Sequence, residues 1–334
     1  MRKKAKYNVA VVGVGAVGVE MLRVLRQRQF PVGNLKVMAR SARDITVDGQ
    51  TYHVDAIAPE GFEGIDIALF AGTEGEKGAA VTFAAEAVKR GALVIDNGAD
   101  FRMEADVPLI VPEVNPKDVK LAKKGRGIIA NPNCSTIQMV VALAPIHKLL
   151  KLKRVVVSTY QAASGAGASA VEELVNQTKT VLAGGKAEPK ALAKPIAFNL
   201  FPHIGGFVED DFTSEEWKMV KETHKILHTD KIAVTATTAR VPVKNGHSEA
   251  VYIETRKPVD IAAVKKALQE APGIVMVDDV KNASYPMPID ADGRDEVFVG
   301  RVRKDPFNDK GLWLWVVADN LRKGAASNAV QIAE

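Results

Sequence analysis

Residues 7–18 read YNVAVVGVGAVG and decide the fold of the first part of the chain. Residues 7–12 form a continuous apolar run rich in valine, as do strands that are buried on both faces of a parallel sheet. The spacing Gly-x-Gly-x-x-Gly follows directly, and residues 20–29 carry apolar side chains at helical spacing. A strand, a glycine turn and a helix in this order predict a dinucleotide site, because the glycines let the backbone approach a pyrophosphate at the helix N-terminus. The alternative is a tight turn that binds no ligand.

Strand and helix patterns keep alternating through the first third of the chain. We expect strands at 35–39, 65–71 and 92–96 and a helix at 76–90. This alternation predicts a mostly parallel sheet with helices on both faces, and ligands then bind beyond the C-terminal ends of the strands. Two segments follow such ends, namely Gly72-Thr73 and residues 97–102, in which Arg102 is a candidate anion ligand.

The residues after the second strand indicate which dinucleotide binds. Enzymes that use NAD usually place Asp or Glu there to hold the ribose 2′-hydroxyl, whereas this chain has Arg40, Ser41 and Arg43. A guanidinium and a hydroxyl suit a 2′-phosphate, so the sequence predicts NADP. The alternative is that both arginines are solvated loop residues.

The only cysteine, Cys134, lies in the polar stretch NPNCST at residues 131–136. An expected short strand precedes it and a helical pattern over 136–150 follows, so the thiol should lie at a helix N-terminus. The positive end of the helix dipole stabilises a thiolate, which is the nucleophilic form of cysteine. The alternative is a buried structural cysteine. A single cysteine cannot form an intramolecular disulfide, so we expect a reducing, cytoplasmic location.

Composition narrows the class of protein. The 334 residues are 47% hydrophobic and 25% charged, which fits a globular protein of two domains. The net charge of +5 is spread along the chain rather than clustered with aromatic residues, so nucleic acid is not expected as a partner, whereas small anionic substrates are. No apolar run approaches the length of about 18 residues that a membrane span requires, so no membrane association is expected.

The remainder of the chain is predicted to form an α+β domain. Its expected strands are 154–160, 231–241, 249–255, 297–303 and 312–318. One expected helix ends at Leu182, a second begins at a Ser214 cap, and a third spans 260–269. We expect the 231–241 and 249–255 strands to be antiparallel and joined through residues 242–248. Helices should cover one face of the sheet only, and its other, apolar face should meet a second subunit. The final helix, 324–332, is expected to dock on the first domain.

Several polar residues of this domain are candidates for chemistry. Glu215 and Lys218 share a helix face, either as a surface ion pair or as a substrate clamp. Arg240 and His247 flank the connection between two expected strands and could both point into a cleft there. His224 and His228 also share a face, but no third ligand is apparent and a metal site is not expected.

Taken together, these motifs resemble the aspartate-semialdehyde dehydrogenases almost from end to end. The matching segments are residues 131–136, 160–167, 215–218, 240 with 247–249, 293–301 and 319–326. The resemblance implies a Rossmann-type NADP-binding domain at 1–133, completed by the helix at 319–334. It also implies a catalytic and dimerisation domain at 134–318 with a largely antiparallel sheet, as in glyceraldehyde-3-phosphate dehydrogenase.

The resemblance also implies a reaction and roles for individual residues. NADPH reduces β-aspartyl phosphate to aspartate semialdehyde and phosphate is released, in the biosynthesis of lysine, threonine and methionine. Cys134 is implied to form an acyl-thioester, His247 to act as general acid and base, and Gln161 to orient the reacting groups. Arg240 would bind the substrate α-carboxylate and Glu215 its α-amino group. The implied phosphate ligands are Arg102, Asn133 and Lys218. The implied cofactor contacts are Gly13, Gly15, Ala16, Val17, Gly18, Arg40, Ser41, Thr73, Ser164, Gly165 and Asn320.

The chain departs from the family pattern at two places. Val12 stands where the family commonly has the first glycine of its loop, and Gly98-Ala99-Asp100 replaces a serine-containing segment before Arg102. The second departure resembles the corresponding segment of N-acetyl-γ-glutamyl-phosphate reductase, but the Asn-Cys-Ser turn does not resemble the turn of that enzyme. Glu215 also argues against that enzyme, because the acetylated nitrogen of its substrate carries no positive charge that a carboxylate could bind. The remaining alternative is a nucleotide-binding scaffold without catalysis. A homodimer that could pair into a tetramer is the expected assembly.

Overall fold

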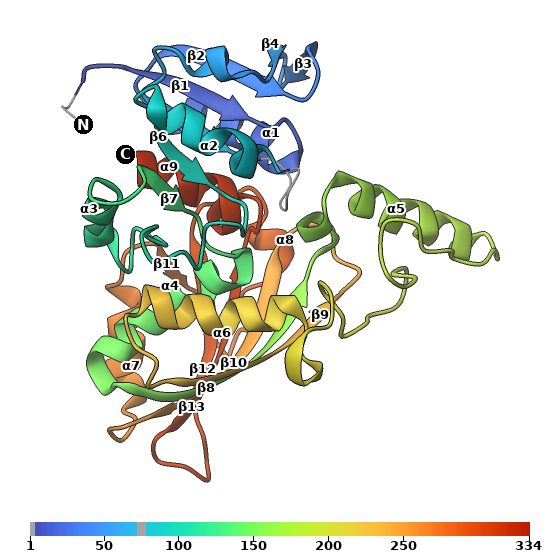
Figure 1. Ribbon diagram of the computed structural model, residues 1–334. Helices are drawn as coiled ribbons and strands as arrows, with labels where there is room; N and C mark the ends of the chain where they lie inside the picture. Colours follow the sequence, from blue (N-terminus) through green and yellow to red (C-terminus); the bar gives the residue numbers. More distant parts are fainter. Residues whose placement is uncertain (1–3, 72–77) are drawn as a thin grey trace. The chain divides into compact units, whose positions relative to one another are not determined.

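The computed structural model describes residues 4–71 and 78–334, and the chain forms two compact units (Figure 1). The first unit comprises Met1–Pro132 and Ala325–Glu334, and the second comprises Asn133–Gly324. Each unit contains its own sheet, and the functional residues predicted above are divided between them.

The first unit is built on a sheet with the strand order β3-β4-β2-β1-β5-β6-β7. All of its described pairs are parallel except β3 with β4, so the predicted mostly parallel sheet is confirmed. Its strands are β1 Tyr7–Val12, β2 Val32–Ala39, β3 Arg43–Val47, β4 Gln50–Ala56, β5 Ile67–Phe70, β6 Leu93–Asp96 and β7 Ile128–Ala130. Its helices are α1 Ala16–Gln27, α2 Ala79–Lys89, α3 Val119–Ala122 and α9 Ser327–Ala333, with short 3-10 turns at Pro59–Phe62 and Pro116–Asp118.

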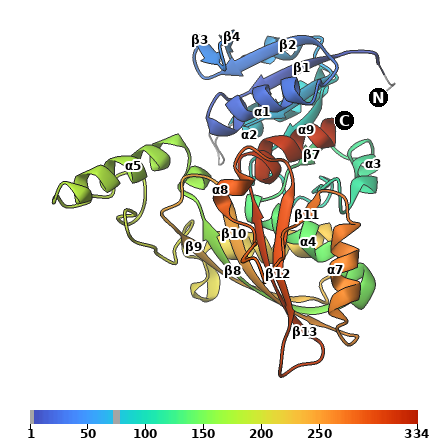
Figure 2. The ribbon, with the colours of Figure 1, turned by 180° about the vertical axis from the view of Figure 1, so that it is seen from behind.

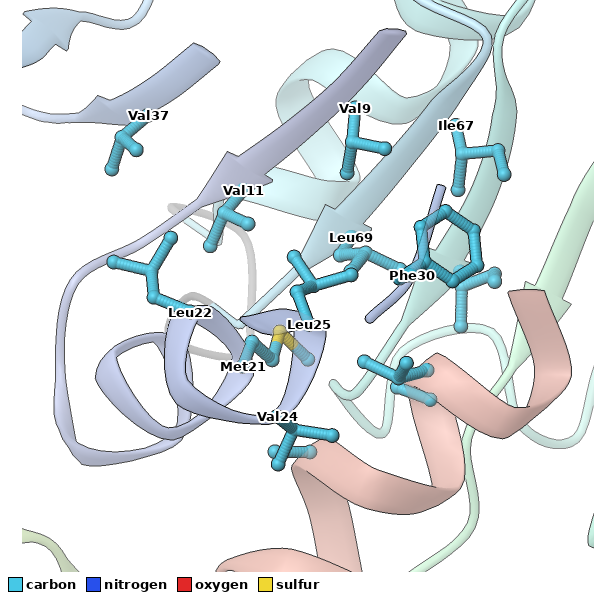
Figure 3. Packing of buried hydrophobic residues seen from close by; sticks show 14 of the residues in the cluster. Val9, Val11, Met21, Leu22, Val24, Leu25, Phe30, Val37, Ile67 and Leu69 are labelled. Carbon is cyan, nitrogen blue, oxygen red and sulfur yellow. The ribbon is translucent and has the colours of Figure 1, made fainter. Parts of the chain in front are cut away.

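The core of this unit lies between the sheet and helices α1 and α9. Figure 3 shows Val9 and Val11 of β1 facing the Met21 and Leu25 side chains of α1. Val330 and Ile332 of α9 belong to the same buried cluster. The C-terminal helix is therefore an integral part of the first unit.

Two local features of the first unit differ from expectation. Helix α1 begins at Ala16 rather than at residue 20, so its first turn follows the glycine loop directly. Strands β3 and β4 form a hairpin that was not predicted. Asp48 and Gly49 connect them with φ of 47° and 80°, the left-handed conformation that tight hairpin turns require.

The second unit is built on a sheet with the order β11-β12-β13-β10-β8-β9. The three central pairings are antiparallel and the two outer ones are parallel, so the predicted largely antiparallel sheet is confirmed. Its strands are β8 Leu152–Gln161, β9 Ala233–Arg240, β10 His247–Thr255, β11 Ile274–Met276, β12 Val297–Lys304 and β13 Gly311–Ala318. Its helices are α4 Cys134–Leu150, α5 Ala168–Leu182, α6 Ser214–Ile226, α7 Ile261–Gln269 and α8 Pro288–Ala291.

Helices α4, α6 and α7 lie on one face of the second sheet (Figures 1 and 2). The opposite face carries two aromatic pairs, Tyr160 with Trp315 and Tyr252 with Trp313, whose ring centroids are 5.4 and 4.9 Å apart. Tyr160 is exposed on this face and the other three rings are half-buried. Aromatic side chains thus line this face, as the sequence predicts, and the Pro286 segment covers Trp315 in part, because the Trp315 indole donates to the Pro286 carbonyl at 3.1 Å.

Two details of the second unit correct the predictions. Strands β9 and β10 are not neighbours, because β8 lies between them and pairs with both. The cap of α6 is Thr213 and not Ser214: the Thr213 hydroxyl accepts from the Glu216 amide, and the Glu216 carboxylate accepts from the Thr213 amide. This reciprocal capping box fixes the first turn of α6, which carries Glu215.

Candidate active site

Cys134 is the first residue of helix α4 and is half-buried. Asn133 caps the helix, and its Oδ1 accepts from the backbone amides of Ser135 at 3.0 Å and Thr136 at 3.1 Å. The cysteine is therefore held at the positive end of a helix of 17 residues. This placement favours the thiolate over the thiol.

Helix α6 holds the same turn from the other side. The carboxylate of Glu222 accepts from the backbone amide of Asn133 at 2.7 Å, and Glu215 Oε1 accepts from Asn133 Nδ2 at 2.8 Å. Gln161 Nε2, at the end of β8, donates to the same Glu215 oxygen at 3.3 Å. Glu215 is buried and its Oε2 lies 3.7 Å from Nζ of the half-buried Lys218, so this pair is not a fully exposed surface ion pair.

Arg240 ends β9 and is almost fully buried. Its Nη1 donates to the carbonyl of Ala162 at 2.6 Å. Burial lowers the pKa of Arg240, while the nearby Cys134 and Glu215 raise it again by favouring the cation. The guanidinium thus lies within electrostatic reach of both the nucleophile and the buried carboxylate.

His247 begins β10 and is completely buried. The amide of Ala162 donates to its Nδ1 at 3.1 Å, so Nδ1 keeps its lone pair and a neutral ring carries its proton on Nε2. No described residue makes a hydrogen bond to Nε2. Burial, followed by the charge of Arg240, lowers the pKa of His247 well below its usual value, so the ring is neutral at physiological pH.

Gly165 separates Arg240 from His247. A Cβ at this position would lie 2.9 Å from Arg240 Nη1 and 3.0 Å from His247 Nε2. Only glycine fits here without displacing one of the two side chains. Close packing of the loop therefore fixes the spacing between the cation and the imidazole.

A polar network supports this loop. Ser164 Oγ donates to Asn245 Oδ1 at 2.8 Å, and Asn320 Nδ2 donates to Ser164 Oγ at 2.9 Å. Asn320 Oδ1 accepts from the backbone amide of Gly246, the residue before His247, at 3.0 Å. Three segments that are distant in the sequence are thereby joined beside the imidazole.

The glycine loop of the first unit has the geometry of a phosphate cradle. Gly13 has a φ of 99°, and a Cβ on Gly18 would lie 1.8 Å from the Gly13 carbonyl oxygen, so α1 packs directly on the loop. No side chain caps α1 at Gly15, and the amides of Ala16, Val17 and Gly18 lie in its first turn, where no intrahelical acceptor exists. Donors of this kind bind a pyrophosphate.

The other predicted residues of the first unit are less tightly grouped. Arg40 is exposed at the end of β2, and the Ser41 hydroxyl accepts from Arg43 Nη1 at 3.1 Å. Arg102 is buried, and its guanidinium donates to the carbonyls of Asn131 at 2.9 Å and Asn97 at 2.7 Å. Thr73 lies outside the described residues.

Within the second unit the structure brings together ten of the predicted site residues. They are Asn133, Cys134, Gln161, Ser164, Gly165, Glu215, Lys218, Arg240, His247 and Asn320. Glu222 and Asn245 were not predicted. A signal for Glu222 was available, because it follows Glu215 by seven residues and so lies on the same helix face. No such pattern marks Asn245.

Two features are absent from residues 4–71 and 78–334. No group of three or more His, Cys, Asp or Glu side chains is arranged to hold a metal ion. No helix combines the length and the apolar character that a membrane crossing requires.

Comparison with known proteins agrees with this geometry. The model of the semialdehyde dehydrogenase NAD-binding domain matches residues 8–122, and that of the semialdehyde dehydrogenase dimerisation domain matches residues 143–323. The aspartate-semialdehyde dehydrogenase of Aquifex aeolicus is 55% identical to the chain, over 98% of this chain and 97% of that protein.

Solved structures give the same result. The crystal structure of aspartate-semialdehyde dehydrogenase II from Vibrio cholerae, complexed with ASA, has a TM-score of 0.94 and 45% identity, and the match covers 99% of this chain and 98% of the other. The structure of the Candida albicans enzyme with NADP has a TM-score of 0.74 and 26% identity, over 98% and 97% of the two chains.

Proposed function

The chain belongs to the aspartate-semialdehyde dehydrogenase family, and from this premise we propose that it reduces β-aspartyl phosphate to L-aspartate 4-semialdehyde with NADPH and releases phosphate. The reaction serves the biosynthesis of lysine, threonine and methionine. The observation that carries the proposal is the grouping of Cys134, at a helix N-terminus, with buried Arg240, His247 and Glu215. A nucleophile, a carboxylate ligand, a proton donor and an ammonium ligand are the groups that this substrate requires.

Cys134 is the nucleophile of the proposed reaction. Its thiolate attacks the acyl carbon of β-aspartyl phosphate, a C–S bond forms, and the C–O bond to the phosphate breaks. The helix N-terminus and the nearby guanidinium of Arg240 lower the energy of the thiolate. The product is an acyl-thioester that retains the energy needed for reduction.

His247 acts as a donor in the neutral state. Because Ala162 occupies Nδ1, the Nε2–H is the group that can stabilise, and protonate, an oxygen that becomes negative at the acyl carbon. The depressed pKa of His247 keeps the ring from adding a second positive charge beside Arg240. Gln161 orients the substrate from the end of β8.

The substrate is bound through its charges. Glu215 pairs with the α-ammonium group, and Arg240 offers the guanidinium nitrogens that Ala162 does not engage to the α-carboxylate. The proposed phosphate ligands are Lys218, Asn133 and Arg102. A substrate with one ammonium and two anionic groups matches this set of side chains in number and sign.

The chain has an NAD(P)-binding domain, and NADP is the proposed cofactor. The glycine loop and the first turn of α1 would hold its pyrophosphate, through Gly13, Gly15, Ala16, Val17 and Gly18. Arg40 and Ser41 would hold the 2′-phosphate, Thr73 would contact the dinucleotide, and Ser164, Gly165 and Asn320 would contact the nicotinamide. When bound, the reduced cofactor supplies the hydride that converts the thioester to the aldehyde. The structure of the relative from Candida albicans, which contains NADP, supports this choice of cofactor.

A homodimer is the proposed assembly, formed through the aromatic face of the second sheet. Tyr160, Tyr252, Trp313 and Trp315 would supply its apolar contacts, and pairs of dimers could form a tetramer. Residues 1–133 with 319–334 would be the cofactor domain, and residues 134–318 would be the catalytic and dimerisation domain. A cytoplasmic location remains the expectation from the single cysteine.

The reverse reaction tests the substrate. Purified protein is mixed with NADP and phosphate and with either aspartate semialdehyde or N-acetyl-glutamate semialdehyde, and NADPH formation is followed by absorbance. Activity with aspartate semialdehyde alone supports the proposal. Preference for the acetylated substrate would show that the chain is an N-acetyl-γ-glutamyl-phosphate reductase instead. No activity with either substrate, in protein that binds NADPH, would support the alternative of a nucleotide-binding scaffold without catalysis.

A further inference from the structure

Glu249 is a carboxyl group sealed inside the second unit. It lies two residues after His247 on β10, so both side chains project from the same face of the strand, and it is 0% exposed. Its neighbours across the sheet are Thr159 of β8 and Val316 of β13, neither of which is charged. Within the described chain, neither carboxylate oxygen has a hydrogen bond of ordinary geometry. An ionised carboxylate in such a place would be strongly unfavourable.

The side chain that adjoins this carboxyl group is Gln138 of α4. Gln138 lies one helical turn after Cys134 and is also 0% exposed. Its Nε2 donates to the backbone carbonyl of His247 at 3.4 Å, while its Oε1 has no partner among the residues described. Gln138 Oε1 and the two oxygens of Glu249 are therefore buried acceptors without a hydrogen bond of ordinary geometry among the described residues.

A proton on Glu249 would satisfy both groups. A carboxylate can only accept hydrogen bonds, whereas a carboxylic acid has one O–H to donate and Gln138 Oε1 is an acceptor that needs it. Burial raises the pKa of Glu249 well above its usual value, and the nearby amide group of Gln138 lowers it only in part. The charge of Arg240 acts on His247, whereas within residues 4–71 and 78–334 the pKa of Glu249 responds to burial and to Gln138 and to no cation.

We propose that Glu249 is a neutral carboxylic acid that donates to Gln138 Oε1, and that this pair fixes the Cys134 end of α4 against the His247 end of β10. Glu249 and Gln138 are then positioning residues, because they act on the reacting groups through one helical turn and through one backbone carbonyl. This inference rests on the proposed function, in which Cys134 and His247 act on the same acyl carbon.

Three substitutions separate this role from others. Glu249→Gln supplies an N–H in place of the O–H, so kcat and KM are expected to stay within about three-fold of wild type. Glu249→Leu and Gln138→Leu remove the link, and each is expected to lower kcat by about 10- to 100-fold with little change in KM, since a displacement of about 1 Å at the reacting atoms can cost about 100-fold. The double Leu variant should lose no more than either single variant, because the two residues act as one unit.

A second readout does not depend on the substrate. The rate of Cys134 alkylation by iodoacetamide is measured against pH, with thermal unfolding of each variant. Glu249→Leu is expected to shift the alkylation profile and Glu249→Gln to restore it. Glu270→Gln and Glu270→Leu, on the exposed end of α7, are matched controls that should change neither readout.

The outcomes distinguish the proposals from each other. If Glu249→Gln is as slow as Glu249→Leu, Glu249 acts through a negative charge and the inference is overturned. If the Leu variants unfold at lower temperature but keep wild-type kcat and alkylation, the pair is structural only and the inference fails. Should Glu249→Leu not fold, Glu249→Gln and Gln138→Leu decide the question. A wild-type protein without dehydrogenase activity would refute the proposed function, while the alkylation profiles would still test the link.

Discussion

Gly165 allows a sharp steric test of the site, because replacing it with alanine adds a single methyl group between Arg240 and His247. Gly165 does not have a φ in the left-handed region, so alanine can adopt its backbone conformation without strain. The new Cβ would lie 2.9 Å from Arg240 Nη1 and 3.0 Å from His247 Nε2. Ordinary contacts of a Cβ begin at 3.4 Å, so the two groups must recede by about 0.5 and 0.4 Å.

This displacement sets the expected loss of activity. A misplacement of about 1 Å at reacting groups can cost about 100-fold in rate, so half of that distance corresponds to about 10-fold, or about 1.4 kcal/mol in the barrier. The assay is kcat/KM for aspartate semialdehyde at saturating NADP and phosphate, with thermal unfolding measured in parallel. The melting temperature should change little, because no apolar contact is lost.

Gly206→Ala is the matched control. Gly206 lies outside helices and strands, whereas Gly165 lies in the short 3-10 helix Ala163–Ala166. Like Gly165, Gly206 does not have a φ in the left-handed region, and a Cβ there meets no atom within 4 Å. Wild-type kcat/KM in Gly165→Ala would refute the account of how this loop spaces Arg240 and His247. An equal loss in both variants would show that the effect comes from the loops in general.

Three further predictions concern the cofactor, the buried acid and the assembly. Arg40→Ala should lower the ratio of kcat/KM for NADP to that for NAD by about 10- to 100-fold, the value of a charged hydrogen bond, and an unchanged ratio would show that Arg40 does not read the 2′-phosphate. Folding raises the pKa of Glu249, so the protonated side chain contributes to the free energy of unfolding. This contribution is complete below pH 4.5, the ordinary pKa of the group, and is lost as the pH rises toward the pKa in the folded protein. In urea unfolding at pH 5 and pH 8, the free energy of unfolding of Glu249→Gln should therefore rise relative to that of wild type, by at most about 1.4 kcal/mol per pH unit. A difference between the two proteins that does not change with pH would mean that Glu249 does not titrate as argued. Trp313→Glu on the aromatic face should shift the protein from dimer to monomer in sedimentation velocity, whereas a monomeric wild type would rule out that interface.

Much of the first unit was predictable because its elements are specified locally. The valine-rich run, the glycine loop and the alternating strands each follow from backbone requirements that act within about ten residues. The missed hairpin at β3 and β4 also had a local signal, since Asp48-Gly49 between two short strands is typical of a tight hairpin turn. The expected helix began too late because Ala16, Val17 and Gly18 were assigned to the loop alone.

The second unit shows what a local pattern cannot specify. Strands β9 and β10 are consecutive in the chain, but β8 lies between them, and only long-range packing decides that order. Cys134 at a helix N-terminus was predictable from the flanking patterns. The burial of Glu249 was not, because a glutamate on a strand usually faces solvent, and only its phase with His247, Val251 and Ile253 indicates the inner face.

The central claim is that Cys134 carries the acyl group of a phosphate-dependent dehydrogenase. The most direct measurement follows NADPH formation from aspartate semialdehyde and NADP, with and without phosphate, in wild type and in Cys134→Ser. We expect sustained turnover only in wild type with phosphate, and no turnover in the variant although it still binds NADPH. Phosphate-dependent turnover that persists in Cys134→Ser would contradict the account, because the acyl group would then be carried elsewhere.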